Sequence, residues 1–203
     1  MTNTIPRNDI TAIILAGGKA RRMSGEDKGL ISLHGRPMID YIIDALQPQV
    51  GNILVNANRN TGQYAAFGLP VIADMLGDYF GPLAGMASGM NATETTFIVT
   101  APCDSPIIPV NLVETLYRAL QENQADISVA HDGERMQPVF ALLRCSLLAS
   151  LLDYLNEGGR KIYTWFGQQP IVLADFSGSP DTFLNLNTPE DKQLLESRLT
   201  NGR

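Results

Sequence analysis

The sequence predicts an α/β fold in which helices cover both faces of a mostly parallel sheet. Short apolar runs alternate with amphipathic stretches over residues 10–121, and this alternation is typical of strand–helix–strand units. Several apolar runs end at glycine, asparagine or aspartate, as expected of strands that open into loops at one edge of a sheet. In the second half, Asp132-Gly133 lies between two apolar runs and indicates an added hairpin.

The composition favours one globular domain. A chain of 203 residues with 44% hydrophobic content can bury one sizeable core, so we expect a single domain over residues 1–203. The formal net charge of −6 argues against a general binder of nucleic acid or anionic membranes, because such proteins need broad basic surfaces. The chain has only two cysteines, and no apolar run approaches the ~18 residues of a membrane span. We therefore expect a cytoplasmic monomer with no nucleic-acid or membrane partner.

The elements of the first half follow from local patterns. Apolar and β-branched residues fill positions 10–15, which predicts a strand buried on both faces, and a short extended piece is expected at 29–33. Turn residues lead through Pro37 into a helix at 38–46. Compact apolar runs predict strands at 52–56, 70–73 and 96–100. A Gly-Pro pair begins a helix at 81–91, and leucines at helical spacing predict another at 109–121.

The second half departs from this alternation. Apolar runs on either side of the Asp-Gly turn predict strands at 127–130 and 139–143. Helices are expected at 146–155 and 161–166, and short strands at 171–174 and 183–186. The last helix, at 188–199, has the clearest start, with Thr188 at the N-cap, Pro189 at the first helical position and two acidic residues in the first turn.

The loop after the first strand concentrates positive charge. Of the fifteen lysines and arginines, four lie between positions 19 and 28. The loop is not a Walker A motif, because Lys28 is followed by Gly29, and Gly17-Gly18 does not match the dinucleotide-binding fingerprint. Its backbone N–H groups, with Lys19, Arg22 and Lys28, suit a triphosphate, although a tight turn with a solvated basic face explains the same residues equally well.

Polar residues end three of the predicted strands. Asp104 follows a buried strand, where its carboxylate is able to bind Mg²⁺ or to cap the following turn. Asn56 and Asp74 also stand at strand ends and suit either a base edge and a ribose or ordinary turn formation. On the residues alone, these alternatives stay open.

Several motifs in order resemble one family. Leu15-Ala16-Gly17-Gly18, Arg22-Met23 and Asp27-Lys28-Gly29 are similar to the signature of nucleotidyltransferases with the sugar-nucleotide pyrophosphorylase fold. Within that superfamily, further segments resemble the molybdenum cofactor guanylyltransferases, the MobA family, from about residue 13 to residue 195. These segments are Val55-Asn56-Ala57-Asn58-Arg59, Gly81-Pro82-Leu83-Ala84-Gly85-Met86, Pro102-Cys103-Asp104-Ser105-Pro106, His131-Asp132-Gly133-Glu134-Arg135 and Asn185-Leu186-Asn187-Thr188-Pro189-Glu190.

The resemblance implies a Rossmann-like three-layer α/β/α nucleotidyltransferase fold and a specific reaction. GMP would pass from GTP to the terminal phosphate of molybdenum-molybdopterin, with Mg²⁺ as cofactor and pyrophosphate as the second product. The N-terminal half would serve mainly the nucleotide and the C-terminal half mainly molybdopterin. Other cofactor-biosynthesis proteins, acceptor molybdoenzymes and their chaperones are the further partners it suggests.

The resemblance also assigns roles to residues. Lys28, Arg22 and Asp104 are the expected catalytic residues, with Asp104 as the metal ligand. Including Gly18 and Lys19 from the loop, the expected nucleotide-binding residues are Leu15, Ala16, Gly17, Gly18, Lys19, Lys28, Asn56, Asp74 and Asp104. Gly17 favours a purine, since related cytidylyltransferases are expected to carry alanine there.

Roles in the second half are more open. Asn185 and Asn187 lie two apart in an expected strand and so share a face, which the resemblance places in the active site. They equally suit a structural role before Thr188. The Asp132-Gly133 turn, Arg135 and the pair Arg160-Lys161 are candidates for the pterin-phosphate side of the cleft, or simply an exposed hairpin and solvated helix-start residues. A cytidylyl- or sugar-nucleotidyltransferase on the same fold, and a non-catalytic nucleotide or cofactor carrier, are the competing functions.

Overall fold

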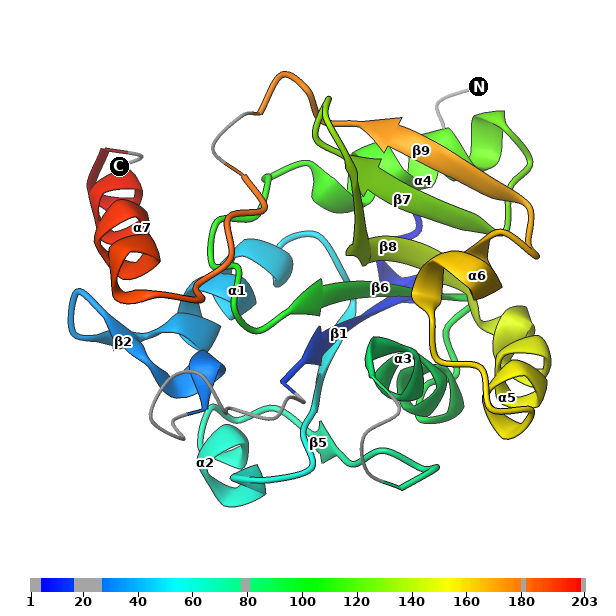
Figure 1. Cartoon of the computed structure of the whole chain (residues 1–203), viewed down its shortest axis with the longest axis horizontal. Helices are drawn as coiled ribbons and strands as arrows, with labels where there is room; N and C mark the ends of the chain where they lie inside the picture. Colours follow the sequence, from blue (N-terminus) through cyan, green and yellow to red (C-terminus); the bar gives the residue numbers. More distant parts are fainter. Residues whose placement is uncertain (1–4, 17–26, 78–80, 180–181, 202–203) are drawn as a thin grey trace.

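The computed structural model describes residues 5–16, 27–77, 81–179 and 182–201. A seven-stranded sheet with the order β5-β4-β1-β6-β8-β7-β9 forms its centre (Figure 1). In this sheet β8 runs antiparallel to both of its neighbours, and the other strands run parallel to one another. The strands are β1 (Ile10–Leu15), β4 (Asn52–Asn56), β5 (Val71–Ile72), β6 (Phe97–Pro102), β7 (Ile127–His131), β8 (Met136–Arg144) and β9 (Ile171–Asp175).

Helices pack on both faces of this sheet, which confirms the predicted α/β class. They are α1 (Met38–Leu46), α2 (Thr61–Ala65), α3 (Pro82–Asn91), α4 (Leu112–Glu122), α5 (Leu148–Asn156), α6 (Ile162–Phe166) and α7 (Pro189–Asn201). Short 3₁₀ turns occur at η1 (Arg7–Asp9), η2 (Lys28–Leu30) and η3 (Cys145–Leu147). None of the helices in the described ranges is long and apolar enough to cross a membrane.

Strand β1 lies between β4 and β6, and all six of its residues are buried. Its side chains alternate between two cores, because successive residues of a strand point to opposite faces. Ile14 belongs to the core that includes α1 and α4, whereas Ile13 belongs to the core that includes α3, α5 and α6. The continuous apolar run at 10–15 is therefore the signature of a central strand covered on both sides.

Helix α3 lies unusually close to the sheet because it presents glycines to it. A Cβ atom on Gly85 would come within 2.4 Å of the side-chain oxygen of Asn56, and one on Gly89 within 2.6 Å of Ile13. Any larger residue at these positions would push α3 away. The two glycines thus keep the start of α3, at Pro82, next to the carboxyl end of β1.

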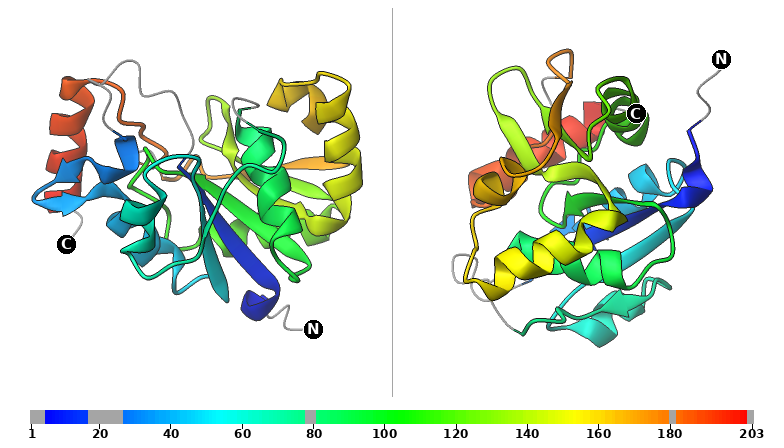
Figure 2. Two further views of the ribbon diagram at one scale, coloured as in Figure 1. Left: turned by 90° about the horizontal axis from the view of Figure 1, so that it is seen from below. Right: turned by 90° about the vertical axis from the view of Figure 1, so that its right-hand side faces the viewer.

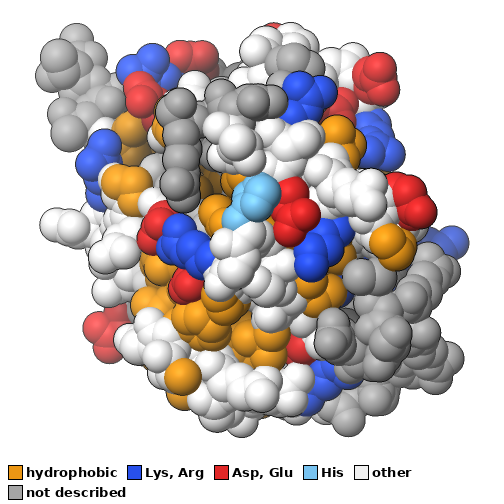
Figure 3. Space-filling view, turned by 90° about the vertical axis from the view of Figure 1, so that its left-hand side faces the viewer, with side chains coloured by type: hydrophobic (Ala, Val, Ile, Leu, Met, Phe, Trp, Pro, Cys, Tyr) orange, Lys and Arg blue, Asp and Glu red, His pale blue; other side chains and the backbone are white. Residues whose placement is uncertain are grey.

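A hairpin and the last helix form one end of the molecule. Strands β2 (Ser32–Leu33) and β3 (Arg36–Pro37) are joined by His34 and Gly35, both with positive φ, as in a two-residue hairpin turn. Leu33 packs with Leu186 and Leu195 in a small separate core, and Figure 2 shows α7 beside the hairpin. Acidic and basic side chains are interspersed among the described residues of this end (Figure 3), as in the ion pairs of Arg36 with Asp40 and Asp44.

Several element predictions differ from the structure. Residues 29–33 are not continuously extended, since η2 occupies 28–30 before β2 begins. Residues 183–186 form no regular strand, because Phe183 has a φ of 64° and packs its ring against Phe140 and Phe176. Helix α2 was not predicted, and β8 begins at Met136, earlier than the apolar run at 139–143 suggests.

Candidate active site

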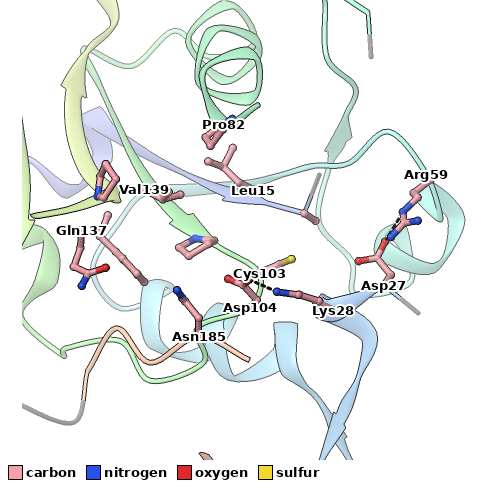
Figure 4. Close-up of a pocket in the computed structure, with 14 residues that line it drawn as sticks. Leu15, Asp27, Lys28, Arg59, Pro82, Cys103, Asp104, Gln137, Val139 and Asn185 are labelled. Carbon is pink, nitrogen blue, oxygen red and sulfur yellow. Dashed lines mark hydrogen bonds and ion pairs between the residues drawn. The ribbon is translucent and has the colours of Figure 1, made fainter. Parts of the chain in front are cut away.

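A cavity of ≈ 450 Å³ lies at the carboxyl ends of β1 and β6 (Figure 4). Ligands of open α/β sheets bind at this edge, where the strand order reverses around the first strand. The residues that line the cavity come from β1, β6, β8, η2, the start of α3 and the segments that follow β4 and β9. They are Leu15, Ala16, Asp27, Lys28, Arg59, Pro82, Pro102, Cys103, Asp104, Gln137, Pro138, Val139, Phe140 and Asn185.

A bulge in β8 gives the cavity its β8 wall. Ala130 of β7 pairs with Gln137, but the preceding residue, Val129, pairs with Ala141, so residues 138–140 have no partner in β7. Pro138 has no N–H to donate to a ladder, and the Thr100 hydroxyl donates to the carbonyl oxygen of Val139 at 2.7 Å. The bulge lies where the pairing of β8 with β6 ends, and it brings side chains of β8 to the cavity.

Lys28 and Asp104 meet in the middle of the cavity. Lys28 Nζ lies 2.9 Å from Asp104 Oδ2 and 2.6 Å from Asn187 Oδ1. The Lys28 and Asp104 side chains are each about one quarter exposed, so a ligand in the cavity is able to reach both. Lys28 begins η2, while Asp104 directly follows the buried β6 and the Pro102-Cys103 pair. A cation and a carboxylate are therefore held at one point by two elements far apart in the sequence.

The residue before Lys28 is fixed by a buried network. The Tyr64 hydroxyl donates to Asp27 Oδ1 at 2.5 Å, and Asn60 Nδ2 lies 3.3 Å from Asp27 Oδ2. Arg59 Nε also lies 3.5 Å from that second oxygen. Tyr64 is fully buried and Asp27 is 6% exposed. This network, defined by Asp27, Arg59, Asn60 and Tyr64, attaches the η2 turn to α2.

Gly29 is required by the same packing. A Cβ atom on Gly29 would lie 2.7 Å from the Tyr64 hydroxyl oxygen and 3.2 Å from Cys103 Cβ. Burial, together with neighbouring Cys103 and the hydrogen bond to Asp27, raises the pKa of Tyr64 well above its ordinary value. Burial likewise raises the pKa of Cys103, so both groups stay protonated at neutral pH. Cys103 is thus a small apolar wall of the cavity and not a thiolate.

Asn56 and Asp74 form a second polar network beside the cavity. Asn56 Nδ2 donates to Asp74 Oδ1 at 3.0 Å, and Asn58 Nδ2 donates to Asp74 Oδ2 at 2.7 Å. The Asp74 N–H donates back to Asn58 Oδ1 at 2.8 Å. Leu15 pairs with Asn56 in the β1–β4 ladder, so this network lies one strand away from the cavity wall.

Asn185 and Asn187 both reach the site, although they do not lie in a strand. The Leu186 N–H donates to the Asp104 carbonyl oxygen at 2.8 Å, which holds this segment alongside the residues after β6. The Asn185 side chain is hydrogen-bonded to the Ser105 hydroxyl and lines the cavity, while Asn187 accepts from Lys28. The two side chains therefore face the same region, as their spacing predicts.

The structure brings many of the predicted residues together and leaves others elsewhere. Leu15, Ala16, Lys28, Asp104 and Asn185 line one cavity. The predicted residues Gly17, Gly18, Lys19 and Arg22 lie outside the described residues.

The cavity lining given above includes neither the Asp132-Gly133 turn nor Arg135, Arg160 and Lys161, which were predicted on the pterin side. Arg135 lies in the β7–β8 turn with Nε 3.7 Å from Asp132 Oδ2. Arg160 Nη1 donates to the carbonyl oxygens of Leu155 and Gly159. Lys161 precedes α6, and its carbonyl oxygen accepts from the Tyr154 hydroxyl. Their roles stay predictions.

Three polar or charged lining residues were not among the predicted site residues. Asp27 stands in the quoted Asp-Lys-Gly motif, and Arg59 in the polar loop after β4. Gln137 precedes Pro138, and a proline inside an apolar run is a signal for a bulge. That signal would have indicated that β8 starts before residue 139 and turns a polar side chain toward the site.

The donor set at Asp104 fits Mg²⁺ bound together with a ligand. No group of three or more His, Cys, Asp or Glu side chains that could hold a metal occurs within residues 5–16, 27–77, 81–179 and 182–201. Mg²⁺ commonly takes one or two protein carboxylates and completes its six positions with water and phosphate oxygens. Asp104 is such a carboxylate, and the amide oxygens of Asn185 and Asn187 are the other oxygen donors nearby.

Comparisons with known proteins show what the chain is similar to. The family model of the MobA-like NTP transferase domain matches residues 12–171. A protein from Shewanella halifaxensis named molybdenum cofactor guanylyltransferase is 47% identical over 194 residues, which are 96% of this chain and 97% of the relative. One of the same name from Shewanella sediminis is 48% identical over 190 residues, or 94% and 97% of the two chains.

Solved structures show the same fold. Molybdopterin-guanine dinucleotide biosynthesis protein A from Archaeoglobus fulgidus has a TM-score of 0.79 at 20% sequence identity, over 94% of this chain and 99% of that one. The 4-diphosphocytidyl-2C-methyl-D-erythritol synthase of Anaerococcus prevotii has a TM-score of 0.74 at 14% identity, over 95% and 96%. At these identities the likeness concerns the fold alone.

Proposed function

Because the chain belongs to the MobA-like NTP transferase family, we propose that it transfers GMP from GTP to the terminal phosphate of molybdenum-molybdopterin. The chain is a nucleotidyltransferase of molybdenum cofactor dinucleotide biosynthesis. The finer assignment of GTP and molybdopterin draws on the names of relatives 47–48% identical to it. Its main structural support is the Lys28–Asp104 pair, which stands in a cavity beside the carboxyl ends of β1 and β6.

In the proposed reaction, an oxygen of the molybdopterin phosphate attacks the α-phosphorus of GTP. The bond from that phosphorus to the β-phosphate oxygen breaks, and pyrophosphate leaves. A phosphate monoester with a second pKa of about 6 is already largely ionised at neutral pH, so the attacking oxygen needs no strong general base. The side chains of the described cavity lining accordingly include no histidine.

The protein's contribution is to hold two polyanions next to each other. Lys28 would donate to a phosphate oxygen and offset negative charge, and Asp104, 2.9 Å from it, would hold the Mg²⁺ that the same phosphates bind. Asn56 and Asp74 would serve the nucleoside, because their network adjoins Leu15. Asp104, with Asn185 and Asn187 nearby, would hold Mg²⁺. When bound, Mg²⁺ offsets the charge that develops on the departing pyrophosphate.

We also propose that residues 1–203 act as one domain and as a monomer in the cytoplasm. The N-terminal half would bind mainly the nucleotide and the C-terminal half mainly molybdopterin. Proteins that make the cofactor precursor or receive the product are the further partners that this reaction requires.

A nucleotide panel tests the proposal. Purified protein is incubated with molybdenum-molybdopterin, Mg²⁺ and GTP, CTP or UTP, and products are identified by mass spectrometry. We expect molybdopterin guanine dinucleotide and pyrophosphate with GTP and far less product with the pyrimidine nucleotides. Preferential use of CTP would assign the chain to cytidylyl transfer, and preferential use of a sugar phosphate as acceptor would assign it to sugar-nucleotide synthesis.

A further inference from the structure

Gln137 lines the end of the cavity formed by the β8 bulge. It is 9% exposed, and its Nε2 lies 2.6 Å from Asp132 Oδ2 in the turn between β7 and β8. Asp132 itself does not line the cavity. A buried amide on the cavity wall is therefore tied to a carboxylate behind it.

This carboxylate decides which way the amide points. Asp132 Oδ1 accepts the N–H groups of Glu134 and Arg135 at 2.9 and 2.8 Å, and the Arg135 side chain lies near Oδ2. Burial raises the pKa of Asp132, but the hydrogen bonds from Arg135, Glu134 and Gln137 together outweigh it, and the pKa falls below its ordinary value. An ionised carboxylate only accepts hydrogen bonds. The nitrogen of Gln137 must therefore face Asp132, and its oxygen must face away.

The oxygen of Gln137 is thus presented to the cavity. Figure 4 shows it on the side of Asn185, with the nitrogen turned outward. The wall around it is largely apolar and consists of Pro102, Pro138, Val139 and Phe140. In such surroundings an amide oxygen favours a ligand that donates a hydrogen bond, because a ligand without a donor leaves the acceptor unpaired.

Gln137 lies on the opposite side of the Lys28–Asp104 pair from Arg59 (Figure 4). The predicted nucleoside residues Asn56 and Asp74 belong to β4 and the segment after β5, across β1 from β8. In a displacement at phosphorus, the attacking oxygen approaches opposite to the departing pyrophosphate, so the acceptor needs room that neither the nucleoside nor the pyrophosphate fills. With the nucleoside expected on the β4 side, that room lies toward β8. The β8 end of the cavity is therefore the acceptor end.

We propose that Gln137 Oε1 accepts an N–H hydrogen bond from the pterin ring of molybdopterin, and that Asp132 is the positioning residue that fixes this orientation. The inference rests on the proposed function for the identity of the acceptor. A pterin is a flat heteroaromatic ring with N–H donors on its edge, and it suits a wall of proline, valine and phenylalanine that carries one fixed acceptor.

The first test replaces Gln137 by a residue of similar length without hydrogen-bonding groups. In Gln137→Met, we expect the KM for molybdopterin and its dissociation constant in equilibrium dialysis without GTP to rise about twofold to tenfold, the effect of one neutral hydrogen bond. The KM for GTP should stay within about twofold. Glu134→Gln, an exposed change in the same turn, is the matched control and should leave all three values unchanged.

The second test changes the orientation and keeps Gln137. Asp132→Asn preserves the side-chain shape and an acceptor for the turn N–H groups, but it also offers Gln137 a donor and lets its amide turn around. We expect a smaller rise in the molybdopterin dissociation constant, although residue 132 is outside the cavity lining. In the Gln137→Met background, the same change should have no further effect.

Several results would overturn the inference. The first is unchanged binding of molybdopterin by folded Gln137→Met protein. The second is an equal rise in the KM for GTP and the KM for molybdopterin. The third is that Gln137→Met and Asp132→Asn raise the molybdopterin dissociation constant additively. Failure of the proposed function has a different signature, namely wild-type protein that binds molybdopterin and GTP but forms no dinucleotide. The dialysis measurement then still decides whether Gln137 contacts the pterin.

Discussion

Among single residues, the Lys28–Asp104 pair is the main support for the proposed site. Two opposite charges 2.9 Å apart in a cavity are each a ready partner for a ligand of the other sign. A nucleotide with Mg²⁺ supplies both signs at once, because its phosphates suit Lys28 and its metal suits Asp104. The pair therefore also keeps each side chain in place when no substrate is bound.

Asp104→Asn should abolish most transfer while the fold is retained. The substitution keeps the side-chain shape at a partly exposed position and removes the charge that would hold Mg²⁺, so turnover should fall on the order of a hundredfold or more. Asp126→Asn is the matched control, since Asp126 is also partly exposed and ion-paired, with Arg144 at 3.2 Å, but lies at the start of β7. Pyrophosphate release at saturating Mg²⁺ measures both. Near-normal turnover in Asp104→Asn would contradict its role.

Lys28→Met should weaken the nucleotide side of the reaction. Loss of one charge-assisted contact of ~1.5–3 kcal/mol corresponds to roughly a tenfold to hundredfold loss in kcat/KM for GTP. Steady-state kinetics and a GTP titration of the free protein measure the effect. Unchanged turnover together with an unchanged titration would exclude a phosphate contact at Lys28.

Tyr64→Phe tests whether the buried network positions Lys28. The change removes the donor to Asp27, a carboxylate that is 6% exposed, so the free energy of unfolding should fall by ~1.5–3 kcal/mol. Turnover should fall as well, because Asp27 precedes Lys28. Tyr163→Phe, at a position 58% exposed on α6, is the control. Urea unfolding and turnover are measured for both variants. Wild-type values for Tyr64→Phe would mean that the network does not position Lys28.

At the element scale, the sequence predicts best where the signal is local. The limits of β1, β4 and α1 were predicted correctly, because each is an uninterrupted apolar run or an amphipathic repeat between turn residues. The strand predicted at 183–186 is wrong. Phe183 has a positive φ there and packs its ring against two aromatic residues, so the segment does not pair with the sheet. Asp27 and Tyr64 are 37 positions apart, so no local pattern reveals their bond.

Helix α7 has an N-terminal cap that reaches the site. Asp191 Oδ2 accepts the N–H groups of Asn187 and Thr188, both at 2.9 Å, and the Thr188 hydroxyl accepts the Asp191 N–H at 3.2 Å. This reciprocal pair resembles a capping box. Because Asn187 accepts from Lys28, the cap links the start of α7 to the cavity.

Thr188→Ala should therefore lower the free energy of unfolding by about 0.5–2 kcal/mol. Ser197→Ala, in the same helix, leaves the cap intact and is the control. Chemical unfolding of both variants measures the difference. Equal values for Thr188→Ala and the wild type would mean that the cap does not stabilise α7.

The cap also has a pH dependence of known sign. Hydrogen bonds from the Asn187 and Thr188 backbones hold the pKa of Asp191 below its ordinary value of about 3.9. As pH falls, the unfolded chain takes up this proton first, so the contribution of Asp191 is complete above about pH 5 and is lost as pH falls through the lower folded pKa. The protection of α7 amides against hydrogen exchange, measured relative to an unstructured chain at the same pH, should thus decrease in acid, and less so in Asp191→Asn. An identical acid profile in the two proteins would contradict this.

At the scale of the whole molecule, the site exists because separate elements meet at one sheet edge. β1 supplies Leu15, the segment after β6 supplies Asp104, η2 supplies Lys28, and β8 supplies Gln137 beside its bulge. The sequence predicts the strand ends from their polar residues. It does not show that β8 bulges beside β6 or that the segment at 183–187 runs along Asp104, because both depend on pairing between distant parts of the chain.

The donor set predicts that Mg²⁺ binds after, or together with, the nucleotide. Asp104 is a single carboxylate, and the described residues contain no cluster of three or more potential metal ligands, so a Mg²⁺ ion held there would take the rest of its shell from water and the phosphate oxygens of a nucleotide. Isothermal titration at millimolar Mg²⁺ should give no saturable heat with the free protein and a stoichiometric signal in the presence of GTP. Stoichiometric Mg²⁺ binding without nucleotide would contradict this order.

Label transfer shows whether this cavity joins the α-phosphate of GTP to molybdopterin. The protein is incubated with molybdenum-molybdopterin, Mg²⁺ and GTP labelled at the α-phosphorus or, separately, at the γ-phosphorus, and products are separated. We predict that α-label appears in a molybdopterin dinucleotide and γ-label in pyrophosphate, in equal amounts. Binding of GTP without movement of either label, as in a carrier, would contradict the account.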